Sequence, residues 1–163
     1  MKSPIKGLTA VVVGLGLIVA GCSAASGATE MTSEAAAAVE INETAYIEAF
    51  LQKDLDAFME TMAEDVVFVD ETFGDHLVGK AAVRNMYVHV IRFADPDASG
   101  VLDRFVSLDA TFAASTWDWI GTNAFGKPFD LPIVLVHEYR DGKIVKETTY
   151  YASPDAYGQL MGS

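Results

Sequence analysis

The chain has 163 residues, and its 23 acidic and 11 basic side chains give a net charge of −12 when the histidines are neutral. Such an acidic surface repels phosphate backbones, which argues against nucleic acid as a partner. The chain has one cysteine, three histidines without ligand spacing and no glycine-rich phosphate loop. The sequence therefore predicts no internal disulfide, no metal site and no cofactor.

The N-terminus has the layout of a secretory signal. Lys2 and Lys6 precede an uncharged run from Leu8 to Ala20, which is shorter than the roughly 20 residues of a membrane-spanning helix. The residues that close the run, Val19-Ala20-Gly21-Cys22, resemble the lipobox of bacterial lipoproteins. The resemblance implies that residues 1–21 are cleaved and that lipidated Cys22 anchors the protein to a bacterial membrane outside the cytoplasm, whether inner or outer. The alternative is an ordinary secreted protein whose cysteine is there by chance.

Cleavage after residue 21 would remove two lysines and no acid, which leaves a net charge of −14. Residues 22–39 are mostly Ala, Ser, Thr and Gly, a composition that predicts a flexible tether. The stretch from Glu34 to Glu40 also suits an extension of the helix that follows. Residues 40–163 contain enough apolar residues for the core of one domain.

The domain begins with two predicted helices. Ile47, Phe50 and Leu51 have the i, i+3, i+4 spacing of an amphipathic helix over 42–52. Asp54 is a candidate N-cap for a second, shorter helix.

A strand over 66–70 follows, in which Val66, Phe68 and Asp70 share one face. Apolar residues at helical spacing then predict a helix over 83–91 that ends before Asp95-Pro96. The remaining predicted elements are strands at 101–108, 111–120, 131–139 and 144–151. Helices followed by antiparallel strands predict an α+β domain with a curved sheet wrapped on helices.

The order of the motifs resembles the nuclear transport factor 2-like superfamily, particularly its SnoaL-like and ketosteroid-isomerase-like members. The residues that carry the resemblance are 46–50, 54–56, 63–70, 79–84 with Tyr87, and 139–145. The resemblance implies a cone-shaped α+β barrel, in which three N-terminal helices pack on a curved, mostly antiparallel sheet around a pocket. Its members include isomerases, cyclases, dehydratases, epoxide hydrolases and proteins without catalytic activity, so the fold alone does not set the function.

Tyr46 and Asp70 fall where ketosteroid isomerases place a phenolic donor and a carboxylate base. A carboxylate in a mostly apolar cavity can take a proton from the carbon next to a carbonyl, while a phenol stabilises the enolate oxygen. The alternative is that Asp70 caps the turn after its strand and that Tyr46 is a half-buried aromatic residue of its helix.

The resemblance places the second acid of the oxyanion hole at Leu135, which cannot donate a hydrogen bond. His137 shares the face of Leu135 and is a candidate second acid that pairs with Asp70 or Glu147. The alternative is a strand histidine satisfied by a neighbouring group.

The pairing around His137 depends on the hairpin turn at residues 140–143. A type I turn with a bulge at Gly142 pairs His137 with Val145, and the family alignment favours this register. A two-residue turn pairs His137 with Lys146 instead.

The candidate ligand-binding residues are Phe68, Tyr87, Trp117, Trp119 and Glu147. The two tryptophans share one strand face, where they form either a flat wall of the pocket or, with Val134 and Val136, a homodimer interface on the outer face of the sheet.

Two functional hypotheses follow from the sequence. The first is a membrane-anchored, cofactor-free acid/base isomerase, cyclase or dehydratase that acts on a small hydrophobic carbonyl compound. The second is a non-enzymatic lipoprotein that binds a small hydrophobic ligand or a protein partner.

Overall fold

The computed structural model describes the backbone of residues 23–162 and the side chains of residues 34–162. The predicted signal sequence and the lipidation site Cys22 lie outside these residues. The helices are α1 (Ser23–Gln52), α2 (Leu55–Glu60), α3 (Lys80–Val90), which continues into the 3₁₀ turn η1 (Ile91–Phe93), and α4 (Ala156–Met161). The strands are β1 (Met62–Asp70), β2 (Asp75–Val78), β3 (Gly100–Val106), β4 (Phe112–Thr122), β5 (Pro128–Arg140) and β6 (Lys143–Tyr151).

One curved sheet contains all six strands in the order β2-β1-β6-β5-β4-β3. β1 runs parallel to β6, and the other neighbours are antiparallel. The architecture is the predicted α+β fold, with helices packed on one face of a curved, mostly antiparallel sheet. The resemblance implied a barrel, but the sheet is open, because β2 and β3 are edge strands that do not pair with each other.

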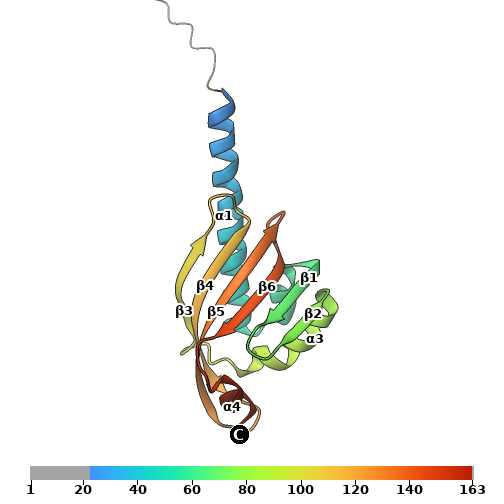
Figure 1. The fold of residues 1–163 in the computed structure, drawn as a ribbon, viewed down its shortest axis with the longest axis vertical. Helices are drawn as coiled ribbons and strands as arrows, with labels where there is room; N and C mark the ends of the chain where they lie inside the picture. Colours follow the sequence, from blue (N-terminus) through green and yellow to red (C-terminus); the bar gives the residue numbers. More distant parts are fainter. Residues whose placement is uncertain (1–22, 163) are drawn as a thin grey trace, which may run out of the picture.

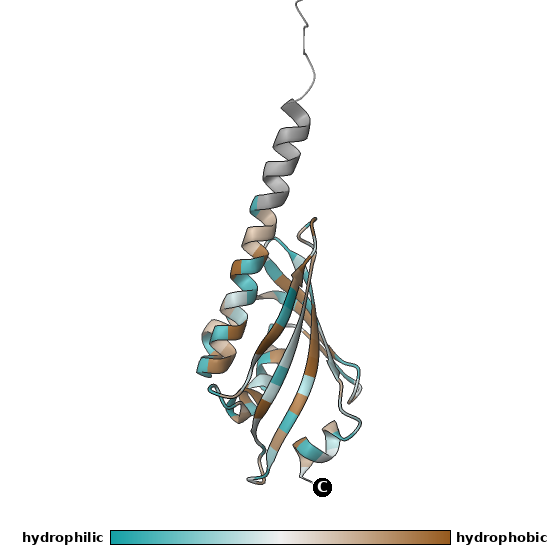
Figure 2. Ribbon diagram, turned by 90° about the vertical axis from the view of Figure 1, so that its left-hand side faces the viewer, coloured by the Kyte–Doolittle hydropathy of each residue, from teal (hydrophilic) through white to brown (hydrophobic). Residues whose placement is uncertain are grey.

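Helix α1 lies along one face of the sheet (Figures 1 and 2), and its N-terminal turns project beyond the strands in Figure 1. The projecting end of α1 and the C-terminal helix α4 lie at opposite ends of the molecule (Figure 1). The flexible tether expected over 22–39 is therefore wrong for the described part of that segment, which is helical from Ser23 onward. The alanines of this segment favour a helix, and no proline or glycine interrupts residues 28–52. Within residues 23–162, no helix has both the length and the hydropathy to span a membrane.

The turn between α1 and α2 has the predicted chemistry. Lys53 adopts a left-handed conformation with φ of 60°, which ends α1. The Asp54 carboxylate then accepts a hydrogen bond of 3.0 Å from the Ala57 backbone N–H and caps α2. The two helices thereby turn sharply and bury Phe58 against the sheet side of α1.

The β5–β6 hairpin differs from both predicted registers. Asp141 and Gly142 have φ values of 54° and 71°, so they form a two-residue turn with positive φ at both positions. Pairing is regular up to Tyr139 and Ile144, but the register then shifts. Val145 is left as a bulge, because Glu138 pairs with Lys146 and His137 pairs with Glu147. The bulge restores Glu147 to the helix-covered face, where a simple two-residue hairpin would have turned it away.

The two tryptophans of β4 lie on the helix-covered face of the sheet. Trp117 and Trp119 are 2% and 4% exposed, and both pack against Phe50 of α1. They therefore form part of the pocket wall. Val134 and Val136 are half-buried on the opposite face, and a homodimer through that face stays a prediction.

Candidate functional site

A cavity of about 220 Å³ opens between the helices and the covered face of the sheet. Its walls are mostly aromatic and aliphatic, with contributions from α1, α3, β1, β2, β4, β5, β6 and α4. The predicted residues Tyr46, Phe68, Asp70, Tyr87, Trp117 and Trp119 all line it. The structure therefore brings together, in one cavity, side chains that lie as much as 73 residues apart in the sequence.

Asp70 ends β1 with its carboxylate at the cavity. Its Oδ1 atom accepts hydrogen bonds of 2.9 Å from the backbone N–H groups of Thr72 and Phe73, so Asp70 also caps the turn after the strand. Burial raises the pKa of Asp70, although the two backbone hydrogen bonds lower it. A carboxylate with a raised pKa in an apolar cavity is a stronger base than one in water, and only one of its oxygens is used by the turn.

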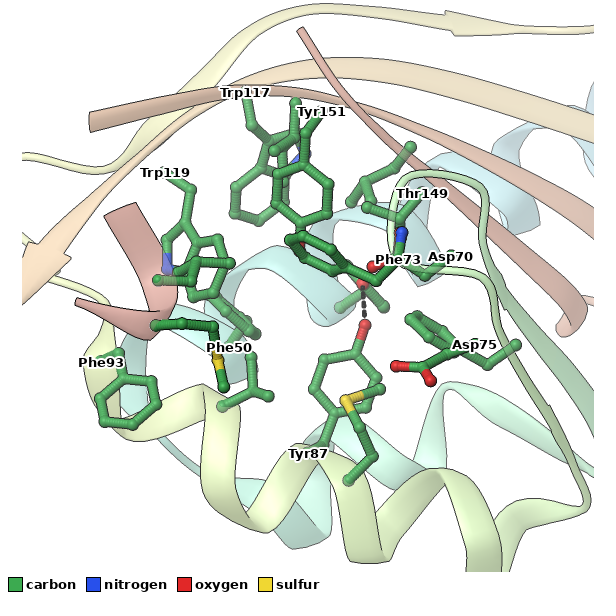
Figure 3. Close-up of a pocket in the computed structure, with 18 residues that line it drawn as sticks. Phe50, Asp70, Phe73, Asp75, Tyr87, Phe93, Trp117, Trp119, Thr149 and Tyr151 are labelled. Carbon is green, nitrogen blue, oxygen red and sulfur yellow. Dashed lines mark hydrogen bonds between the residues drawn. The ribbon is translucent and has the colours of Figure 1, made fainter. Parts of the chain in front are cut away.

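Asp75 is a second carboxylate at the cavity, and the sequence analysis missed it. It begins β2 directly opposite Asp70 in the β1–β2 pair, and its negative charge adds to the raised pKa of Asp70. Figure 3 shows the two aspartates on one side of the cavity and Trp117 and Trp119 on the other. Asp75 was missed because the four-residue strand that places it is too short to show a clear alternation.

Tyr46 and Tyr87 both line the cavity, and their hydroxyl groups lie close together (Figure 3 shows the hydroxyl of Tyr87). Their oxygens are 3.3 Å apart. Tyr46 donates a hydrogen bond of 3.1 Å to Glu147 Oε1, and Tyr87 donates to the same oxygen. Burial, followed by the charge of Glu147, raises the pKa of both tyrosines well above the ordinary value. Both phenols therefore stay protonated and act as donors.

Glu147 was expected to bind the ligand, but it lies behind these tyrosines and does not line the cavity. Its side chain is fully buried, and burial raises its pKa, although His137 and the two tyrosine donors lower it. The bulge in β6 places it opposite His137. Glu147 can thus influence a ligand only through the tyrosine hydroxyls.

His137 also lies outside the cavity lining, among buried residues. The side chain is 1% exposed, and its Nδ1 atom is 2.5 Å from Glu43 Oε1. Its Nε2 atom is 3.9 Å from Glu147 Oε2. Burial alone would lower the pKa of His137, but Glu43 and then Glu147 raise it overall.

Glu43 is the functional-site residue that sequence reasoning missed most clearly. It is fully buried and also accepts a hydrogen bond of 2.7 Å from the Tyr139 hydroxyl. Burial alone would raise its pKa, but His137 and Tyr139 lower it overall. The signal was its spacing, since Glu43, Tyr46 and Phe50 follow the i, i+3, i+7 pattern of one helix face. A carboxylate on such an apolar stripe indicates a buried partner.

The buried histidine makes stability depend on pH. The pKa of His137 is higher in the folded protein than its ordinary value of 6.5. Its contribution is therefore complete below about pH 6.5 and is lost as the pH rises through the folded-state pKa. We expect the free energy of unfolding, measured with urea between about pH 5 and 9, to fall with rising pH. The variant His137→Gln should show a shallower fall, and equal slopes in the two proteins would contradict this assignment.

Comparisons with known proteins agree with this architecture. The family model of the SnoaL-like domain matches residues 44–147. A candidate polyketide cyclase from Silicibacter sp. TM1040 is 28% identical, with a TM-score of 0.63 over 75% of this chain and 94% of that chain. A candidate polyketide cyclase from Pseudomonas putida KT2440 is 25% identical, with a TM-score of 0.62 over 73% and 95% of the two chains.

The fold extends to more distant structures. SalBIII, an epoxide hydrolase/cyclase-like enzyme, is 18% identical, with a TM-score of 0.63 over 72% of this chain and 92% of its own. No curated protein sequence gives a significant match. The family-model match covers more than half of the chain and includes most of the residues that line the cavity. The chain therefore belongs to the SnoaL-like family, within the nuclear transport factor 2-like superfamily.

Proposed function

We propose that the cavity is the active site of a cofactor-free acid/base isomerase, cyclase or dehydratase that acts on a small hydrophobic carbonyl compound. The observation that carries the proposal is Asp70, a buried carboxylate of raised pKa at the wall of an aromatic cavity that also contains two phenol donors. Asp70 is the base, and Tyr46 and Tyr87 are the donors to the carbonyl oxygen.

The cavity favours a neutral, ring-shaped ligand. Its aromatic walls offer flat apolar contacts, and its volume is below the roughly 300–1,000 Å³ typical of sites for drug-sized ligands. The charged residues that line it are Asp70 and Asp75, with no basic side chain among the described lining residues. An anionic compound would be repelled, whereas a neutral ketone would not. The similarity to two candidate polyketide cyclases supports carbonyl chemistry.

The proposed reaction begins when the Asp70 carboxylate takes a proton from the carbon next to the carbonyl group. Negative charge then develops on the carbonyl oxygen, where a tyrosine hydroxyl stabilises it. Return of the proton to the same carbon, to another carbon, or loss of a leaving group would give exchange, isomerisation or dehydration, respectively.

The proposal can be tested with 2-tetralone, a two-ring ketone with acidic protons at C1. Trp117 and Trp119 are the two tryptophans of the chain and both line the cavity, so intrinsic fluorescence reports occupancy directly. We expect 2-tetralone to quench this fluorescence saturably and its C1 protons to exchange with D₂O faster in the presence of the protein, as followed by NMR.

A non-enzymatic ligand-binding role is the alternative. The observation that favours it is the commitment of both tyrosine protons to Glu147, together with an apolar residue, Leu135, where related enzymes have an acid. Saturable quenching by 2-tetralone without any acceleration of exchange would support this alternative and contradict the enzyme.

We also propose that the protein is a lipoprotein anchored through Cys22 on the outer side of a bacterial membrane. The lipobox-like motif at residues 19–22 supports this location, and α1 begins at the next residue. In cell fractionation, the native protein should accompany the membranes. The variant Cys22→Ser lacks the thiol that carries the lipid, so it should lose the membrane anchor. Equal distribution of the two proteins would contradict the anchor.

A further inference from the structure

The tyrosines of the cavity are connected to a chain of buried titratable groups that the base chemistry does not use. Tyr46 and Tyr87 both donate to Glu147 Oε1. The other oxygen, Glu147 Oε2, faces His137 Nε2 across 3.9 Å, and His137 Nδ1 contacts Glu43. This series of titratable groups extends from the cavity into the interior of the protein, and each contact in it joins two different elements of the fold.

The central link of this chain is unusual. Glu147 Oε2 and His137 Nε2 are both buried, and neither has a hydrogen-bond partner among the described residues. An unpaired buried polar atom costs about 1–3 kcal/mol. Their separation of 3.9 Å is too long for a hydrogen bond, so a single proton between these two atoms would make one a donor and the other an acceptor once the two side chains approach each other. Because His137 Nδ1 is engaged with Glu43, that proton has two positions, one on His137 and one on Glu147.

The position of the proton decides what the tyrosines do. When it resides on His137, Glu147 is an anion that requires both phenol donors. When it resides on Glu147, the carboxylic acid no longer needs two donors, and rotation of the carboxyl group would bring its O–H to a tyrosine oxygen. A tyrosine hydroxyl is then free to point its proton at a ligand in the cavity.

We propose that Glu147 is a positioning residue that acts through Tyr46 and Tyr87 to supply a proton to the substrate oxygen, and that His137 restores that proton. The inference rests on the proposed acid/base function. It assigns to a neighbouring strand the role that Leu135 cannot perform.

The transfers balance in each direction. As Asp70 takes the proton from carbon, the His137 imidazolium gives its Nε2 proton to Glu147, and Glu147 passes a proton to a tyrosine whose own proton moves to the carbonyl oxygen. The carbonyl compound has become an enol, Asp70 is protonated, His137 is neutral and Glu147 is again an anion. The reverse transfers, with the carbon proton returned by Asp70, regenerate every group.

Several charged and titratable groups surround this chain. They come from α1, α3, β3, β5 and β6 and comprise Glu43, Tyr46, Tyr87, Arg104, Tyr139 and the central pair His137 and Glu147. Burial and the adjacent acids set the pKa of His137 above 6.5, as described above. The shared proton is therefore retained to a higher pH than on an ordinary histidine and is lost as the pH rises further. Asp70 ionises above its ordinary value of 3.8.

The catalysed exchange of 2-tetralone should therefore have a bell-shaped pH profile after subtraction of the uncatalysed rate. The rate should rise as Asp70 ionises and fall as the shared proton is lost, at a pH above 6.5. A wild-type rate that does not fall there would overturn the proposal, and this result needs no variant.

The variant Glu147→Gln tests the proposal at the residue itself. Glutamine keeps the size and an acceptor for the tyrosines but cannot exchange a proton. We expect at least a 10-fold loss of the exchange rate and loss of the falling limb, with 2-tetralone affinity by tryptophan fluorescence changed less than about twofold. As a matched control, Tyr139→Phe removes a hydroxyl from the same buried cluster, and its profile should keep both limbs.

The outcomes separate the two proposals. If Asp70→Asn abolishes exchange while Glu147→Gln keeps the wild-type rate and both limbs, the proton chain is wrong and the acid/base function stands. If the wild-type protein binds 2-tetralone without catalysing exchange, the acid/base function is wrong, and the proposed proton chain is then wrong as well.

Discussion

Replacement of Asp70 by asparagine is expected to lower the catalysed exchange of 2-tetralone by about 10²- to 10⁴-fold, the usual contribution of a positioned general base. Asparagine has nearly the same size, and its side-chain oxygen can still accept the hydrogen bonds from the Thr72 and Phe73 backbone that hold the turn. The fold and the affinity for the ketone should therefore change little. NMR measurement of exchange, together with fluorescence measurement of binding, separates the loss of the base from a loss of the ligand.

Asp75→Asn is the matched control, because it removes the same charge from the wall of the same cavity. The charge of Asp75 helps to raise the pKa of Asp70. Its removal should move the rising limb of the pH profile to lower pH and leave the maximal rate within about threefold of wild type. Equal losses in the two variants would show that the cavity requires negative charge rather than a base at Asp70.

Replacement of Glu43 by alanine is expected to have the largest effect on stability. It removes the acceptor of both His137 and Tyr139 and leaves their polar atoms unpaired in the interior. Loss of one partner of a buried pair costs about 3–5 kcal/mol, and the free energy of unfolding in urea measures it. Glu48→Ala on the exposed side of the same helix should cost less than about 0.5 kcal/mol.

Glu43→Gln provides a second comparison, because it keeps an acceptor oxygen without the charge. It should recover part of the stability lost in Glu43→Ala. If Glu43→Ala costs no more than Glu48→Ala, the buried cluster contributes nothing to folding and the account of it is wrong.

Periodicity was enough to predict which side chains of one strand share a face of the sheet. Val66, Phe68 and Asp70 alternate with exposed or half-buried positions, so the side of the sheet that buries the first two also buries the third. The same argument places Trp117 and Trp119 together. The sequence could not say which face of β4 the helices cover, because both faces of that strand contain residues of mixed polarity.

The pairing of the buried acids could not be predicted, because it depends on a single bulge. A hairpin without a bulge at Val145 would point Glu147 away from His137, and a one-residue change of register reverses every side chain beyond it. Nothing in the local sequence requires that bulge. The buried position of Glu147 selects it, since its partners Tyr46 and Tyr87 come from distant helices.

The segment from Ser23 to Val39 was predicted to be a flexible tether, but it is helical. Its composition was interpreted as a tether because it offers little apolar surface to bury. Alanine-rich segments nevertheless continue a helix once a packed helix is adjacent, and α1 is held from Val39 onward by the core. Helix α4 was not predicted because six residues are too few to show helical periodicity.

A crystal structure of the protein with 2-tetralone bound would test the central claim most directly. The account predicts that the carbonyl oxygen lies within hydrogen-bond distance of the Tyr46 or Tyr87 hydroxyl. It also predicts that C1 lies about 3–3.5 Å from an oxygen of Asp70, the separation required for proton transfer. A ketone that occupies the cavity with its carbonyl group directed away from both tyrosines, or with C1 beyond reach of Asp70, would contradict the proposed acid/base site.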